Sequence, residues 1–263
     1  MKLQKILSKF QKLHSREIDL SLDRIRFLMS KLGNPQDQIN CIQVCGTNGK
    51  GSSISFLKSI LNNANYKCNV YTSPHVTNIN ERFIFNDEMI SDDELADLLN
   101  EVHEINNGKA LTYFEALASA FFLGCMRYKD NICLAEFGLF GRGDAVNILK
   151  KNLANCITSI SYDHLDWLPE NDRTIERIIY EKTSSLLNSN IIVAKQCSNK
   201  ITECIKKNIS NNSANKVFYG EDYNFVLKEN DFFFYEDQHG SLKIPKPNIK
   251  GDFQLENAST AIA

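Results

Sequence analysis

Apolar residues recur every three or four positions in two segments near the start of the chain, 2–13 and 21–32. This spacing gathers them on one face of a helix, so both segments are predicted to be amphipathic helices. From residue 39 onward, short apolar runs alternate with helical patterns. The predicted strands are 39–45, 68–72, 131–136, 154–160 and 190–194, and the predicted helices are 53–65, 91–102, 112–128, 172–187 and 199–209. Strands that alternate with helices predict an α/β fold with a mostly parallel, doubly wound sheet.

Two of the predicted helices begin with a capping box, in which a hydroxyl residue is followed three positions later by glutamate. These pairs are Ser91 with Glu94 and Thr112 with Glu115. Because each side chain can accept a hydrogen bond from the other residue's backbone, the two helices are predicted to begin directly after Ser91 and Thr112.

After Lys216 the pattern changes to short β segments near the C-terminus of the chain. These segments are 216–219, 224–228 and 232–235. Pro245 and Pro247 then predict a linker, and 254–263 has the pattern of a final helix.

Composition narrows the class of protein. The 263 residues are 43% hydrophobic and 24% charged, which predicts a folded core. A formal net charge of −2 argues against nucleic acid as a partner. The longest mostly apolar stretch, 116–126, is too short for a membrane helix, so no membrane association is expected. The N-terminal residues do not resemble a secretory signal, so the expected localisation is cytoplasmic.

The clearest chemical signal is Gly46-Thr-Asn-Gly-Lys-Gly-Ser52, which lies between a predicted strand and a predicted helix. Backbone N–H groups in such a turn, together with the helix N-terminus, can bind phosphate. The strict Walker pattern is not met, because Val44 occupies its first glycine position and Gly51 follows the lysine. Nucleotide binding is therefore one interpretation, and an ordinary glycine-rich turn is the other.

Polar side chains also follow three other predicted strands. Ser73 lies in Tyr71-Thr-Ser-Pro-His75, Glu136 ends its strand, and His164 lies in Ser161-Tyr-Asp-His164. Each of them alone could be an ordinary solvated or structural residue. Because a parallel sheet brings the carboxyl ends of its strands to one edge, the set together predicts a ligand or metal site there.

Several segments of the chain occur together in the order and spacing of one protein family. They are GTNGKGS, YTSPHVTNINERF, LTYFE, AEFGLFGRGDAVN, TSISYDHLDWL and the Glu-Lys pair at 181–182. From about residue 13 to its end, the chain therefore resembles the folylpolyglutamate synthase/dihydrofolate synthase family, which is similar to the Mur ligases. The segment 13–20 resembles the leader of the bacterial bifunctional members, which also accept dihydropteroate.

The resemblance implies a ligase that joins L-glutamate to the carboxylate of dihydropteroate or a reduced folate, using ATP and Mg²⁺. In that family the carboxylate attacks the γ-phosphate to give an acyl phosphate, and the glutamate amine then displaces phosphate. The chemistry is reasonable, because a carboxylate is a poor electrophile until one of its oxygens becomes a leaving group. Several anions meet in such a site, so cations are needed to screen them.

The resemblance also implies roles for individual residues. For ATP binding they are Asn48, Gly49, Lys50, Gly51, Ser52 and Asn257. For two Mg²⁺ sites they are Ser73, Glu136 and His164. For dihydropteroate they are Leu13, His14, Ser15, Arg16, Thr112, Gly143, Asp144 and Ala145. The expected catalytic residues are Lys50, His164 and Lys182, and Lys182 occupies a position that the family carbamylates.

Some positions depart from the family pattern. The family's G-L-G-G-R-L-D-A-T-N corresponds here to residues 138–147, where Phe140 replaces a glycine and Gly143 replaces a bulky apolar residue. Both positions are expected beside the pterin pocket. Lys182 is followed by Thr-Ser-Ser, where the family prefers Ala-Gly.

The resemblance further implies that residues 1–245 form an ATPase and pteroate-binding domain and that 246–263 begin the connection to a glutamate-binding domain. That second domain is expected to lie beyond this chain, which is expected to act as a monomer. Two other interpretations stay open: a non-catalytic nucleotide- or pteridine-binding remnant, and another enzyme such as a kinase or a different Mur-type ligase. The SPH, DH and EK elements argue against a simple kinase, and the leader at 13–20 favours folate over a cell-wall precursor.

Overall fold

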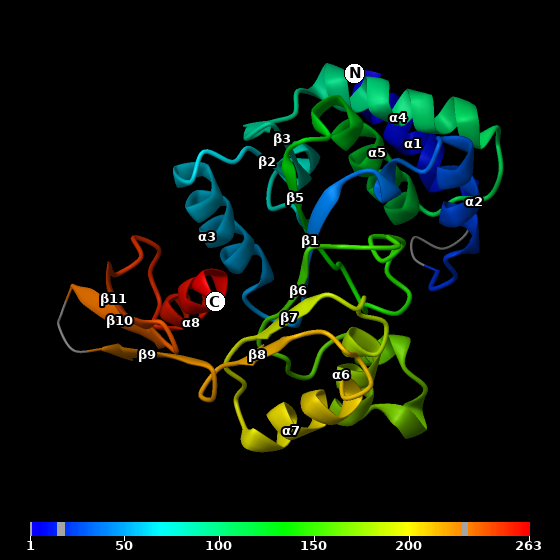
Figure 1. The fold of residues 1–263 in the computed structure, drawn as a ribbon. Helices are drawn as coiled ribbons and strands as arrows, with labels where there is room; N and C mark the ends of the chain where they lie inside the picture. Colours follow the sequence, from blue (N-terminus) through cyan, green and yellow to red (C-terminus); the bar gives the residue numbers. More distant parts are fainter. Residues whose placement is uncertain (1, 15–18, 228–230) are drawn as a thin grey trace. The chain divides into compact units, whose positions relative to one another are not determined.

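The computed structural model describes residues 2–14, 19–227 and 231–263, and its chain divides into two compact units (Figure 1). Unit 1 comprises Met1–Cys41 and Tyr66–Lys151, and unit 2 comprises Ile42–Asn65 and Asn152–Ala263. The fold is mixed α/β with a mostly parallel sheet, which confirms the class predicted from the sequence.

Unit 1 contains the strand order β4-β3-β2-β5. Its strands are β2 (Cys68–Tyr71), β3 (Phe83–Phe85), β4 (Glu88–Met89) and β5 (Ile132–Glu136). β2 and β5 are parallel, with Cys68 opposite Ile132, whereas β3 is antiparallel to both of its neighbours. The carboxyl ends of β2 and β5 therefore lie side by side, at Tyr71 and Ala135.

Four helices of unit 1 pack together, with α1 against α4 and α5, and α2 against α5 (Figure 1). Their bounds are α1 (Lys2–Leu13), α2 (Asp23–Lys31), α4 (Asp92–Asn106) and α5 (Tyr113–Cys125). Short 3-10 segments are η1 (Pro35–Asp37), η2 (Ile79–Arg82) and η3 (Met126–Tyr128). Both predicted capping boxes form, at Ser91 before α4 and at Thr112 before α5.

Unit 2 contains a parallel set of strands in the order β1-β6-β7-β8. They are β1 (Asn40–Cys45), β6 (Ala154–Ile157), β7 (Asn190–Val193) and β8 (Lys216–Phe218). The helices are α3 (Lys50–Asn63), α6 (Ile175–Thr183), α7 (Asn199–Asn208) and α8 (Phe253–Ile262), with the 3-10 segments η4 (Leu165–Trp167) and η5 (Glu170–Asp172). α3 packs on α8, and α6 packs on α7.

A separate antiparallel sheet in unit 2 has the order β11-β10-β9. Its strands are β9 (Tyr223–Leu227), β10 (Phe232–Asp237) and β11 (Gly240–Pro245). Buried aromatic side chains of this sheet form a small core with Leu255 and Ala258 of α8. This core holds α8 in place, and α8 carries the predicted ATP-contacting residue Asn257.

Most predicted elements are confirmed within a few residues. Three strands were not predicted: β3 and β4 are too short to show an alternating pattern, and β11 ends at Pro245, in the segment predicted to be a linker. β8 also differs in its setting, because it joins the parallel strands although the sequence pattern changes there.

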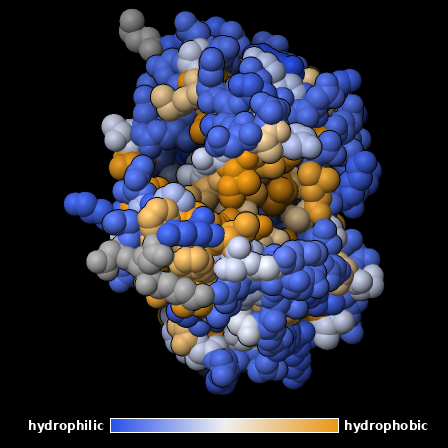
Figure 2. All heavy atoms as spheres, turned by 60° about the vertical axis from the view of Figure 1, so that its left-hand side comes forward, coloured by the Kyte–Doolittle hydropathy of each residue, from blue (hydrophilic) through white to orange (hydrophobic). Residues whose placement is uncertain are grey.

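Charged and polar side chains cover most of the face drawn in Figure 2, and apolar residues gather near its middle. None of the helices in the described ranges is long and apolar enough to cross a membrane.

Candidate active site

The loop between β1 and α3 depends on two glycines. Gly46 has φ +136°, and a Cβ there would lie 2.1 Å from Oγ1 of Thr158. Gly49 is the N-cap of α3 with φ +88°, and a Cβ there would lie 2.2 Å from Oδ1 of Asn257. Any larger residue would therefore be strained and would displace a neighbour. The same contact places Asn257 beside the start of α3, next to the predicted phosphate loop.

Hydrogen bonds to the segment after β6 hold this loop. The backbone N–H groups of Thr47 and Asn48 both donate to the carbonyl of Ser159, at 2.9 and 3.1 Å. Thr47 Oγ1 donates to the carbonyl of Ser161, and Asn48 Nδ2 is 3.4 Å from Ser161 Oγ. The first turn of α3 begins directly after this loop, and N–H groups in the first turn of a helix can donate hydrogen bonds to an anion.

Two lysine side chains converge on one carbonyl of the loop. Lys50 Nζ donates to the carbonyls of Gly46 and Thr47, at 3.3 and 3.0 Å. Lys182, on α6, is almost fully buried, and its Nζ donates to the same Gly46 carbonyl at 2.9 Å. The carboxylate of Asp163 lies 3.8 Å from Lys182 Nζ. Two ammonium groups this close repel each other, so the loop favours a bound anion.

His164 lies beside this cationic group, with Nε2 3.1 Å from Oδ2 of Asp163. Burial lowers the pKa of His164; Asp163 opposes this shift, while Lys182 and Lys50 reinforce it. The neutral imidazole is the form that binds metal ions. Nearby, burial raises the pKa of the Cys45 thiol to about 12 against the same two lysines, so this cysteine stays protonated.

In unit 1, Ser73 and Glu136 lie together at the ends of β2 and β5. The backbone N–H of Ser73 donates to Oε2 of Glu136 at 3.3 Å, and Glu136 is only 4% exposed. A Cβ on Gly138 would come within 3.1 Å of Ser73 Oγ, so a glycine leaves room around this hydroxyl. A carboxylate and a hydroxyl are hard oxygen ligands that suit Mg²⁺, which keeps several waters and substrate oxygens of its own. No cluster of three His, Cys, Asp or Glu side chains able to hold a metal occurs among the described residues.

The carboxylate of Asp144 organises the loop after β5. Oδ2 accepts hydrogen bonds from the backbone N–H groups of Gly138 and Leu139, at 2.8 and 3.0 Å, and Oδ1 accepts one from Val146 at 2.9 Å. Phe140, which replaces a glycine of the family pattern, points into the core and is fully buried. Asp144 therefore shapes this loop through its backbone contacts.

A chain of polar contacts links Thr112 to the segment near the leader. Glu115 Oε2 accepts hydrogen bonds from the backbone N–H of Thr112 at 2.7 Å and from Arg24 Nε at 3.1 Å. Arg24 also pairs with Asp19 at 3.1 Å. The end of the leader is thereby fixed to the start of α5.

Gly143 meets the leader directly, because a Cβ there would lie 2.8 Å from Cβ of Leu20. The bulky residue of the family pattern would clash here, and Leu20 occupies the space instead. Three other residues predicted to contact pteroate are half-buried: Leu13, His14 and Ala145. Ser15 and Arg16 lie outside the described residues.

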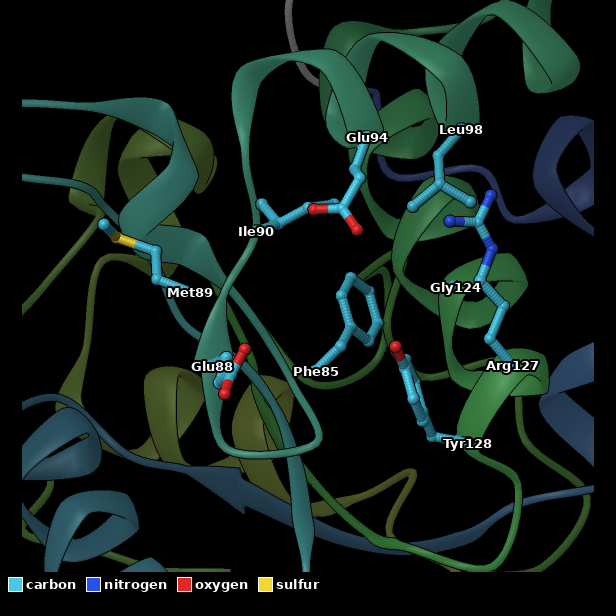
Figure 3. Close-up of a pocket in the computed structure, with 9 residues that line it drawn as sticks. All are labelled: Phe85, Glu88, Met89, Ile90, Glu94, Leu98, Gly124, Arg127 and Tyr128. Atoms are coloured by element: carbon cyan, nitrogen blue, oxygen red, sulfur yellow. The ribbon is translucent and has the colours of Figure 1, made fainter.

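A pocket of about 60 Å³ lies elsewhere in unit 1, between β3, β4, α4 and η3 (Figure 3). Its lining includes Phe85, Met89, Glu94, Arg127 and Tyr128. None of the predicted site residues lines it. This pocket is therefore separate from the predicted site residues.

The structure brings the predicted residues together in two groups. In unit 2, the phosphate loop, Asn257, Lys182 and His164 share neighbours, and Gly51 and Ser52 lie half-buried in the first turn of α3. In unit 1, Ser73, Glu136, Thr112 and the 143–145 segment are linked by the contacts described above. Sequence reasoning missed Asp163, whose position between Lys182 and His164 is a tertiary feature.

Comparison with known proteins assigns the chain to a family. The Mur ligase middle domain matches residues 44–263. The chain belongs to the Mur ligase family. A similar protein is the dihydrofolate synthase/folylpolyglutamate synthase of Escherichia coli, 32% identical over 259 residues, which cover 98% of this chain and 58% of that protein. The Bacillus subtilis protein of the same name is 29% identical over 255 residues, covering 92% of this chain and 58% of its own length. This Mur ligase chain therefore spans less than two thirds of these relatives.

Solved structures agree with this assignment. Escherichia coli FolC in complex with DHPP and ADP has a TM-score of 0.87 and 30% identity, covering 99% of this chain and 60% of that one. The bifunctional folylpolyglutamate synthase/dihydrofolate synthase of Yersinia pestis, complexed with AMPPNP and Mn ion, has a TM-score of 0.86 and 27% identity, covering 99% and 61%. The resemblance found in the motifs is thereby confirmed.

Proposed function

We propose that this Mur ligase chain binds Mg-ATP and dihydropteroate, or a reduced folate, and activates the substrate carboxylate as an acyl phosphate for amide formation with L-glutamate. The proposal depends most on one observation: Lys50 and Lys182 both contact the carbonyl of Gly46, directly beside the N-terminus of α3. Positive charge concentrated beside a helix N-terminus fits the phosphates of a nucleotide.

In the proposed complex, the first-turn N–H groups of α3 bind the phosphates of ATP. Lys50 turns from the loop carbonyls toward the β- and γ-phosphates, exchanging neutral acceptors for anionic ones. Asn257, which packs on Gly49, fixes the nucleotide from the side of α8.

In unit 1 we propose the oxygen atoms of Ser73 and Glu136 as Mg²⁺ ligands. In unit 2 we propose the half-buried His164, beside the phosphate loop, as a metal ligand. When bound, the metal screens the charges of the phosphates and the carboxylate. Ser73 and Glu136 are held together by their own hydrogen bond, so the two donors need little rearrangement to act as a pair.

Carbamylation of Lys182 is part of the proposal. Its neutral amine would add to CO₂ with release of one proton, and the resulting carbamate would carry a negative charge. The supporting observation is the crowding of two ammonium groups on one carbonyl, which this reaction would relieve. The carbamate would then be available to a second Mg²⁺.

For dihydropteroate we propose the part of unit 1 formed by Leu13–Arg16, Thr112 and residues 143–145. The support is the contact between Leu20 and Gly143 and the ion pairs of Arg24, which fix the leader against α5. The carboxylate end of the ligand would be directed toward Ser73 and Glu136.

An isotope experiment tests the proposed chemistry. Dihydropteroate carrying heavy oxygen in its carboxylate is incubated with the chain, ATP and Mg²⁺, with hydroxylamine as a substitute for the glutamate amine. Attack of the carboxylate on the γ-phosphorus followed by breakage of the C–O bond leaves one heavy oxygen in the released phosphate. Unlabelled phosphate released in the presence of bound dihydropteroate would show that water, not the carboxylate, attacks ATP.

A further inference from the structure

Arg82 is a buried arginine without a carboxylate partner. It ends η2, directly before β3, and only 5% of its surface is exposed. Among the described residues no aspartate or glutamate forms an ion pair with it, and its Nη1 is buried with no hydrogen-bond partner. An arginine is protonated at every pH of interest, so this position holds a permanent buried charge.

The neighbours of Arg82 are neutral groups. Its Nε donates to Nδ1 of His75 at 2.9 Å, and its Cζ lies 5.4 Å from the ring centroid of Phe114. His75 accepts this hydrogen bond, and an imidazole ring supplies no negative charge to the guanidinium. The phenol of Tyr71 also lies close: burial raises its pKa, and the guanidinium of Arg82 opposes that rise.

This arrangement would destabilise the fold if Arg82 had only a structural role. Burying an unpaired charge is strongly destabilising, and a cation–π contact with an aromatic ring offsets only part of the lost hydration. The orphaned Nη1 adds the penalty of an unmade hydrogen bond. An anion that binds at Nη1 would remove both costs, so the site is built for a ligand of negative charge.

The position of Arg82 indicates which anion. His75 belongs to the same turn as Ser73, and Phe114 follows Thr112 in the first turn of α5. Asp144 and Tyr113 lie close enough to Tyr71 to raise the pKa of its phenol, and Arg82 lies close enough to lower that pKa. Arg82 therefore lies where the proposed metal ligands and the proposed pteroate-contacting segments of unit 1 meet.

We propose that Nη1 of Arg82 binds the carboxylate of dihydropteroate, the group that the proposed reaction converts into an acyl phosphate. The inference rests on the proposed function and adds a residue that holds the reacting group. His75 takes part as the partner that fixes the guanidinium through Nε. The half-buried ring of Phe114 lies over the guanidinium and must shift for the carboxylate to reach Nη1.

The test removes the negative charge of the ligand and the guanidinium of Arg82 in separate steps. Binding of dihydropteroate is compared with binding of its neutral carboxamide analogue, by calorimetry, for the unmodified chain and for Arg82→Met. Arg127→Met, at an exposed arginine of the same unit, is the matched control. We expect the unmodified chain and the control to prefer the carboxylate by about tenfold or more, and Arg82→Met to show less than about a twofold preference.

Other outcomes separate the inference from the function on which it rests. Equal binding of acid and amide by the unmodified chain, or an undiminished preference in Arg82→Met, overturns the role of Arg82 and leaves dihydropteroate binding intact. A loss confined to Mg-ATP affinity also overturns it, because the anion would then be a phosphate. Failure of the unmodified chain to bind either compound overturns the proposed function itself.

Folding is checked by circular dichroism and thermal unfolding of each variant. If Arg82→Met does not fold, Arg82→Gln, which keeps polar atoms at this position but no charge, replaces it in the comparison, with the same expected loss of preference. Equal binding of acid and amide by the unmodified chain overturns the role of Arg82 even without a folded variant.

Discussion

Substitution of Gly49 by alanine tests the geometry of the phosphate loop, and Gly220 offers a matched control. The two glycines have nearly the same backbone conformation, with φ +88° and φ +84°. A Cβ at Gly49 would lie 2.2 Å from Oδ1 of Asn257, whereas a Cβ at Gly220 would meet nothing within 4 Å. The left-handed conformation alone costs an alanine about 1–2 kcal/mol at either site. Displacing Asn257 adds roughly 1–3 kcal/mol of overpacking at Gly49.

We therefore expect Gly49→Ala to lower the free energy of unfolding by about 2–5 kcal/mol, and Gly220→Ala by about 1–2 kcal/mol. Urea unfolding at pH 7 measures both values. A displaced helix start also misplaces the phosphate donors, so Gly49→Ala should weaken Mg-ATP binding by about tenfold or more, since one charge-assisted hydrogen bond is worth that much. The Gly220 variant should bind as the unmodified chain does. Equal destabilisation of the two variants, with ATP affinity unchanged in both, would refute the reasoning.

Three further substitutions test separate parts of the account. Lys50→Met should raise the Kd for Mg-ATP by about tenfold or more in calorimetry, because it removes a cation proposed to contact the phosphates. Lys58→Met, further along α3, should leave the Kd unchanged. Equal Kd values for the two variants would remove Lys50 from the site. Glu136→Gln should abolish most of the Mg²⁺ dependence of nucleotide binding while its Tm stays within about 4 °C; a collapse of the Tm would make Glu136 a structural residue. Hydrogen bonds from Ser91 lower the pKa of Glu94, so its stabilising effect is present above the unfolded pKa and is lost as the pH falls below about 4.5. Urea unfolding of Glu94→Gln should accordingly show a shallower loss of stability between about pH 5 and pH 3, and an unchanged slope would contradict this assignment.

Features that depend on neighbouring residues in the sequence could be predicted. The capping boxes at Ser91 and Thr112 form as expected, since each needs only residues within one helical turn. The strand, glycine loop and helix around residues 40–63 were also recognisable, because Gly49 and Lys50 mark the point where the strand pattern gives way to the helix.

Features that depend on tertiary neighbours could not be predicted. Nothing near Gly49 in the sequence indicates that Asn257 packs against it, about two hundred residues later. Nothing near Arg82 in the sequence indicates that it is buried, or that Glu81 beside it accepts hydrogen bonds from the backbone N–H groups of residues 76–78. The proposed roles of the site residues stay predictions, which the substitutions above test.

The binding mode of the nucleotide is the most direct test of the central claim. A crystal structure of the chain grown with Mg²⁺ and a non-hydrolysable ATP analogue would provide it. The account predicts that the phosphates lie on the first-turn N–H groups of α3, at 50–52, and that Lys50 Nζ has left the carbonyls of Gly46 and Thr47 to contact them. A nucleotide bound elsewhere, with Lys50 still on those carbonyls, would contradict the account.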